Sequence, residues 1–176
     1  MNGFNISEEG HLVFLIAPQN GTSGVLHSQA FSLANYKHAS IIIGFGAQAG
    51  QGTIIELFAA AATAAAGSAA SGRQALPFNL YKQETSGLSN DVLSAISNQP
   101  STGYQPSGNA NIFYVIEIDA NELEAAGFGG ALADSDGQAA YLQLDVNVAG
   151  EADFVCAFAV LSGGRYQEAQ SLTATA

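Results

Sequence analysis

Hydrophobic and polar residues alternate over short stretches of this chain, and a two-residue period predicts β-strands. The alternation is found at residues 36–45, 74–83 and 141–148, and residues 11–17, 53–58 and 112–118 are also interpreted as strands. Residues 154–161 are apolar at successive positions, which predicts a central strand with both faces covered. We therefore expect an all-β fold, a jelly-roll-like β-sandwich of roughly eight strands with one short helix. The length of 176 residues fits a single domain over residues 1–176.

Turn-forming residues separate these stretches. Residues 18–24 are rich in Pro, Asn, Gly and Ser and predict a chain reversal after the first strand. The glycine-rich residues 46–52 predict a hairpin that joins the strands on either side. Pro77 interrupts another alternating stretch, and proline cannot donate to a ladder. That strand is expected to lie at a sheet edge or to begin after the proline.

The most alanine-rich segment, residues 56–78, raises the choice between a helix and a loop, because alanine has the highest helix propensity. A preceding β-like stretch runs directly into the alanines without a polar cap. Residues 67–72 contain glycines and serines, which weaken a helix, and an alanine-only face buries little apolar area. We predict a small-residue loop between two strands.

One short helix is expected at residues 121–126. Asp119 follows a strand and is suited to cap the first turn, with Glu122 three residues later completing a capping box. Gly127 then provides the stop signal. Residues 1–10 and 167–176 are expected to form terminal arms. The apolar run at residues 11–17 is interpreted as a strand, since Glu8 and Glu9 precede it where a signal peptide carries positive charge.

Charge is scarce and one-sided. Only 11% of residues are charged, and the net charge is −11. Four scattered cations, Lys37, Arg73, Lys82 and Arg165, cannot form a phosphate-binding track, so nucleic acids and anionic membranes are not expected as partners. Such a weakly charged surface favours burial against other subunits of a large assembly. The alternative from composition is a secreted or saline-adapted globular protein.

Candidate catalytic and metal-binding residues are few. His11, His27 and His38 lack the spacing of metal ligands, and we predict no catalytic, cofactor-binding or metal site. Glu117 and Asp119 share one face of a strand, a pairing that a glycosidase could use. Residues 134–137 read DSDG, which fits an Asx-type turn or, without the later bidentate Glu, an incomplete calcium loop. Cys156 has apolar neighbours and is expected to be an inert core residue.

Several stretches resemble a family of small virion proteins of tailed bacteriophages, encoded near the major capsid protein. The resemblance covers most of residues 32–169. The chain departs from the family pattern in its longer alanine loop after Glu56 and in its extended first strand. Its most specific segments are NYKHASIII at 35–43, VIEIDANEL at 115–123 and LSGGRY at 161–166. The resemblance implies a capsid decoration, or cement, protein with a β-sandwich body and no catalytic motif.

We accordingly expect a non-enzymatic protein on the capsid exterior, made in the host bacterial cytoplasm, without cofactors. It would bridge subunits of the major capsid protein as a homo-oligomer, most simply a trimer. Expected contact regions are the N-terminal segment, the alanine loop and residues 99–111, and Arg165 would pair with a carboxylate or lie in solvent. The competing functions are a head fibre or lectin-like module with exposed aromatics such as Tyr104, and a hydrolase using Glu117 and a histidine.

Overall fold

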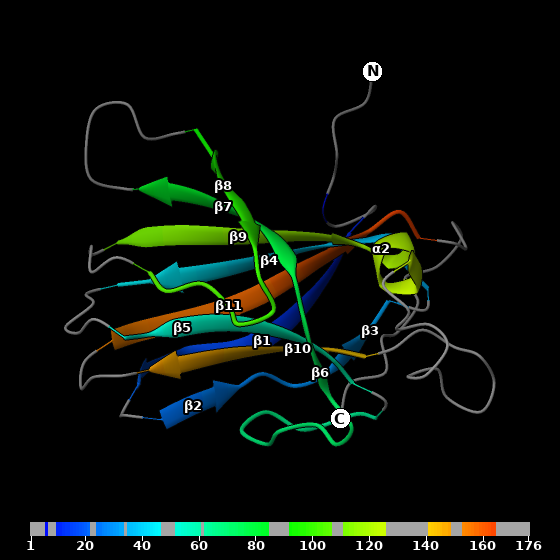
Figure 1. The fold of residues 1–176 in the computed structure, drawn as a ribbon, viewed down its shortest axis with the longest axis horizontal. Coiled ribbons are helices and arrows are strands. Elements are labelled where there is room, and N and C mark those ends of the chain that lie inside the picture. The colour runs from blue at the N-terminus through cyan, green and yellow to red at the C-terminus, as the bar shows by residue number, and fades with distance from the viewer. Residues whose placement is uncertain are drawn as a thin grey trace.

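A computed structural model defines the fold for most of the chain (Figure 1). It describes residues 6, 10–21, 24–33, 35–46, 52–60, 62–84, 92–106, 111–125, 141–148 and 153–164. These residues form eleven strands in two antiparallel sheets and include a short helix, α2. Both predicted arms, residues 134–137 and Arg165 lie outside the described residues, apart from Ile6 and Gly10 of the N-terminal arm.

The larger sheet, which we call sheet A, has six strands. In spatial order they are β1 (His11–Gly21), β11 (Asp153–Ser162), β4 (His38–Phe45), β9 (Ile112–Asp119), β7 (Phe78–Glu84) and β8 (Ser94–Gln99). The predicted central position of the apolar stretch 154–161 is confirmed, because β11 lies between β1 and β4.

The smaller sheet, sheet B, has five strands. Four of them follow the order β2 (Gly24–His27), β10 (Tyr141–Val148), β5 (Ile54–Ala60) and β6 (Gln74–Leu76), and β3 (Phe31–Ser32) also pairs with β10. Alternate residues of both sheets point into one shared core. Ile41 and Ile116 from sheet A and Leu57 and Leu144 from sheet B are all fully buried there. The all-β sandwich is therefore confirmed, with eleven strands in place of the expected eight, while the jelly-roll order stays a prediction.

One predicted connection is wrong, and a second begins later than predicted. The stretches that become β4 and β5 do not form a hairpin, because β4 is paired on both edges, with β11 and with β9, and β5 belongs to sheet B. The predicted reversal at residues 18–24 begins too early, since β1 continues to Gly21. Pro18 is tolerated in that strand because β1 is an edge strand whose register shifts on either side of Ile16.

Pro77 marks the point where the chain passes from one sheet to the other. β6 ends before it in sheet B, and β7 begins after it in sheet A. This agrees with the expectation that the strand begins after the proline. The helix prediction is confirmed with a shift of one residue, because α2 covers Ala120–Ala125. The backbone N–H of Asp119 donates to Glu122 Oε2 at 3.2 Å, which is the glutamate half of the expected capping box.

A matched pair of glycines provides a test of the packing beside β5. Gly103 and Gly67 both have φ of +85°, but a Cβ at Gly103 would lie 2.5 Å from the carbonyl oxygen of Ile55, whereas one at Gly67 meets nothing within 4 Å. We expect Gly67→Ala to cost about 1 kcal/mol from backbone strain alone. Gly103→Ala should cost about 1–3 kcal/mol more because the backbone must move. Urea denaturation of both variants measures this difference, and equal losses would contradict the close approach.

Candidate functional site

The alanine-rich segment is a loop that is bonded to the body of sheet B. Residues 62–73 contain turns and no helix, which confirms the predicted loop for the described residues. The N–H of Ala30 donates to the carbonyl of Ala64 at 2.9 Å, and the N–H of Gly67 donates to the carbonyl of His27 at 2.8 Å. The loop is therefore fixed to the end of β2 and to the segment that follows it.

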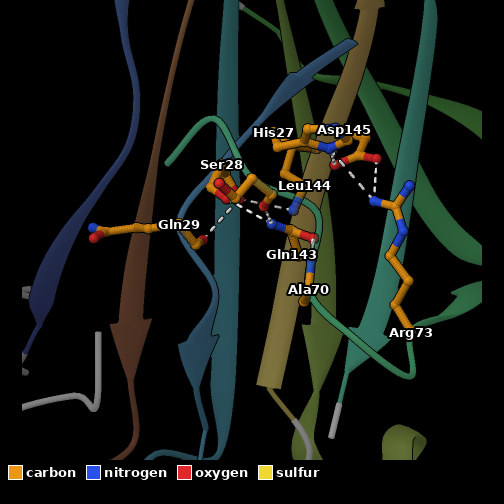
Figure 2. A network of polar contacts seen from close by, with 9 residues as sticks. His27, Ser28, Gln29, Ala70, Arg73, Gln143, Leu144 and Asp145 are labelled. Atoms are coloured by element: carbon orange, nitrogen blue, oxygen red, sulfur yellow. Dashed lines mark hydrogen bonds and ion pairs between the residues drawn. The ribbon is translucent and has the colours of Figure 1, made fainter. Parts of the chain in front are cut away.

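A buried glutamine holds the second half of the loop (Figure 2). Gln143 projects from β10 and is fully buried. Its Nε2 donates to the carbonyls of Ser28 and Ser68, both at 2.8 Å, and its Oε1 accepts the N–H of Ala70 at 2.9 Å. One side-chain amide thus bonds three backbone groups from two segments of the chain. Buried backbone groups need such partners, so Gln143 determines where the loop lies.

An ion pair lies two residues further along β10, in the same outer row as Gln143. Asp145 has only 1% of its side chain exposed, and Arg73 at the end of the loop donates to its Oδ2 (Figure 2). His27 Nδ1 lies 2.8 Å from the other carboxylate oxygen. The Arg73 guanidinium also stacks over Phe58, 4.1 Å from the ring centroid. Burial and the charge of Asp145 raise the pKa of nearby Glu56, and Arg73 opposes that shift.

These contacts correct one expectation and define a surface. The alternation at residues 141–148 predicts a strand with one solvent-facing side, but Gln143 and Asp145 are buried on that side, because the segment after β2 and residues 68–73 supply their partners. Residues 65–69 of the loop remain exposed and carry only Ala, Gly and Ser side chains. We call residues 65–69 the alanine platform. It is a fixed, uncharged surface of small side chains above sheet B.

A second polar cluster lies on the outer face of sheet A, beside α2. His38 Nδ1 is 2.7 Å from Asp119 Oδ1, and His38 Nε2 is 2.6 Å from Glu117 Oε2. Ser40 Oγ donates to the same Glu117 oxygen at 2.7 Å. The pairing of β4 with β9 produces this geometry, because it places His38 opposite Asp119 and Ser40 opposite Glu117. The expected common face of Glu117 and Asp119 is confirmed, with one histidine bridging them.

The two carboxylates favour the charged form of His38. Partial burial disfavours the imidazolium, but hydrogen bonds and charge from Asp119 and Glu117 outweigh it and raise the pKa of His38 above its ordinary 6.5. The stabilisation from this ion pair is therefore fully present below pH 6.5 and is lost as the pH rises through the raised pKa of the folded state.

We expect the melting temperature of the wild-type chain to fall above pH 6.5 more steeply than that of His38→Gln, which has no proton to lose there. Thermal unfolding at a series of pH values for both chains measures the difference. If the melting temperatures of the two chains fall in parallel above pH 6.5, the protonation of His38 does not contribute to stability.

The cluster has part of the arrangement needed for acyl transfer. Ser40 Oγ is 3.3 Å from His38 Nε2, and Asp119 holds the other ring nitrogen. However, Glu117 Oε2 lies closer to the same ring nitrogen than Ser40 Oγ does, and it accepts the hydrogen bond from the serine hydroxyl. The ladders with β11 and β9 on both sides of β4 also take up the backbone N–H groups around Ser40, which leaves no oxyanion donor from that strand. The arrangement is suited to an ion-pair bridge more than to nucleophilic attack.

A pocket of about 380 Å³ adjoins the cluster through Glu117. It lies where the start of β7, the end of β8 and α2 meet, and Asn79, Asn98 and Glu122 add polar groups to its wall. The rest of the lining is apolar: Leu76, Pro77, Phe78, Ile118 and Leu123. The volume falls at the lower end of the range for small-molecule sites, and the lining contains neither a histidine nor a cation.

The remaining candidate residues are distributed over the body. His11 stacks on Tyr36 with ring centroids 5.8 Å apart, so it is a packing residue. The core assignment of Cys156 is wrong, because it points to the outer face of β11 and is half-buried. Among the described residues, no group of three or more His, Cys, Asp and Glu side chains has the geometry to hold a metal ion.

The outer face of sheet A carries exposed hydrophobic side chains. Leu12 and Phe14 of β1 are each 56% exposed, Phe113 of β9 is 41% exposed and Phe154 of β11 is 42% exposed. Cys156 and Phe158 of β11 are half-buried on the same face. We call these six residues the apolar face. A continuous cross-strand row runs through this face over β1, β11, β4 and β9. It consists of Phe14, Phe158, Ile42 and Val115.

Comparison of the chain with protein-family models, with curated protein sequences and with solved structures finds no match. In the part of the chain that the structure describes, no helix has the length and apolar character to cross a membrane. Conclusions about function therefore depend on the surfaces described above.

Proposed function

We propose that this protein is a non-enzymatic capsid decoration protein of a tailed bacteriophage, which docks on the outside of the head and bridges subunits of the major capsid protein. The observation that carries the proposal is the alanine platform, a surface of small uncharged side chains fixed by Gln143 and Arg73. A loop held this firmly loses little conformational entropy on binding, and small side chains allow close backbone approach to a neighbour.

The charge distribution supports the same proposal. Four cations against 15 carboxylates give a chain that repels nucleic acid inside a head and stays soluble outside it. A contact through small uncharged residues is weak in one copy, but it gains avidity when repeated over a symmetric shell. A jelly-roll order of the strands and a symmetric oligomer, with a trimer as the simplest form, belong to this proposal.

The two competing functions have less support. The lectin-like alternative needs Tyr104 as an exposed loop aromatic, but Tyr104 packs on Tyr114 at 5.5 Å and bonds to the backbone of Ile55. The hydrolase alternative gains the proximity of Glu117 and His38 but lacks backbone oxyanion donors from β4 at Ser40. Selective binding on a glycan array would favour the first, and turnover of an ester or glycoside would favour the second.

The proposal is tested on particles of the phage that encodes the protein. Mass spectrometry and cryo-EM of purified heads should locate the chain on the outer surface, and heads that lack it should burst at a lower temperature. Absence of the chain from purified heads would contradict the proposal.

A variant pair tests the platform itself. Added wild-type chain should bind heads that lack it, whereas Ala66→Glu should bind at least about tenfold more weakly, because a carboxylate would be buried without a partner. Ser94→Glu adds the same charge at an exposed position of β8 and should bind like the wild type. Equal binding of both variants would show that the platform is not the contact.

A further inference from the structure

The apolar face is placed where a second sheet could pack. Its six residues belong to β1, β9 and β11. The cross-strand rows through Phe14 and Cys156 hold Ile42, Gly44 and Val115, none of which is charged, while the row through Leu12 continues over Val160 and Ser40 to Glu117 at its far end. In a sandwich, such a surface is covered by another sheet. In this chain, four of its side chains are more than 40% exposed.

Among the residues that the structure describes, the charged groups of this surface lie at one end. His38, Glu117 and Asp119 lie together beside α2, two to four residues along the strands from the row that contains Ile42 and Val115. A basic partner would therefore contact carboxylates of this chain only at that end, because the six residues of the apolar face carry none. A second copy of an acidic chain, in contrast, can approach closely only where neither copy carries charge.

The extent of the face is sufficient for a modest interface. The four strands β1, β11, β4 and β9 lie about 4.8 Å apart and span roughly 19 Å. Along β11, the seven positions from Phe154 to Val160, at about 3.4 Å each, span roughly 24 Å. Two copies would cover roughly 900 Å² in flat projection, and protruding aromatic rings and the adjoining Tyr81 of β7 raise the accessible area toward the lower limit of about 1,000 Å² for a specific interface. Interfaces between identical subunits are also the most apolar class, with charged residues depleted at their centres.

We propose that the apolar face binds the same face of a second copy, so that two chains pair about a two-fold axis. A flat face that meets itself forms a closed pair, whereas a three-fold ring joins two different surfaces. The isolated protein should then be a dimer. This contact is separate from the proposed trimer contact, and where both form, two trimers would pair into an assembly of six chains. This inference concerns the chain by itself and does not depend on its location on a virion.

Sedimentation velocity of the full-length chain over a range of concentrations tests the pairing. The wild type should shift from one to two chains, and added salt should strengthen the dimer because it screens repulsion between acidic subunits. Phe14→Glu should weaken the dimer at least about tenfold, because two carboxylates would be buried without partners. Val25→Glu, at another exposed hydrophobic position, on β2, is the matched control and should dimerise like the wild type.

Cys156 provides an independent readout, because it is the single cysteine of the chain and belongs to the apolar face. Its reaction with a water-soluble disulfide reagent should slow as wild-type protein dimerises and should stay fast in Phe14→Glu. Circular dichroism establishes that each variant is folded. A wild-type chain that stays monomeric, a dimer that Phe14→Glu leaves intact, or a dimer that salt weakens would each overturn the proposal. Protection of Cys156 only on phage heads would assign the face to the capsid protein and overturn it as well.

Discussion

Replacement of Arg73 by methionine is expected to lower the free energy of unfolding by about 3 kcal/mol, because it leaves a buried carboxylate without its cation. Asp145 has 1% of its side chain exposed, and Arg73 is 26% exposed. The loss should therefore fall at the lower end of the range for breaking a buried pair. The same substitution removes the stacking contact on Phe58 and releases the end of the alanine loop.

The control and the reversal make this prediction specific. Lys37→Met removes the same charge from an exposed position and should change stability by less than about 0.5 kcal/mol. The double variant Arg73→Met/Asp145→Leu should recover at least half of the loss, since no uncompensated charge is then buried. Urea denaturation of the wild type, Arg73→Met, Lys37→Met and the double variant measures these differences. An Arg73→Met variant as stable as the wild type would mean that Asp145 is not held by Arg73.

Gln143→Leu is expected to cost about 2–4 kcal/mol, because it removes three hydrogen bonds and leaves backbone groups of Ser28, Ser68 and Ala70 without their partner. Leucine has nearly the same volume, so packing changes little. The companion Gln143→Glu keeps an acceptor for the N–H of Ala70 but loses both donors and buries a charge. It should be at least as destabilised as the leucine variant.

Gln74→Leu serves as the matched control for this substitution, since Gln74 is exposed on β6 and its replacement should be nearly neutral. Thermal and urea unfolding of the three variants measure the difference. If Gln143→Leu were as stable as Gln74→Leu, the loop would not depend on the buried amide.

The strands could be predicted from the sequence because alternation is a local signal. Residues 141–148 alternate from end to end and form β10 with the same bounds. Strand partners could not be predicted in the same way. The stretches around Gly46 have the composition of a hairpin, yet β4 pairs with strands more than 60 residues later in the chain. Such pairing depends on contacts between distant segments that no local pattern records.

The candidate site shows the same limit. The common face of Glu117 and Asp119 followed from their spacing, but the histidine between them comes from a strand about 80 residues earlier. Gln143 and Asp145 looked like solvent-facing residues of a half-buried strand. They are buried because segments far away in the sequence lie against them. The polar residues of this regular strand were the only local signal. Their pattern could not show whether water or a distant loop would be their hydrogen-bond partner.

The central claim is that the alanine loop is a fixed platform, and residue-resolved amide hydrogen exchange of the isolated chain tests it most directly. The N–H groups of Gly67 and Ala70 donate to His27 and Gln143, so their exchange should be slowed to a rate comparable with that of the neighbouring strands β5 and β10. In Gln143→Leu, the protection of Ala70 should be lost first. Exchange of both amides at the rate of an unstructured peptide in the wild-type chain would contradict the account.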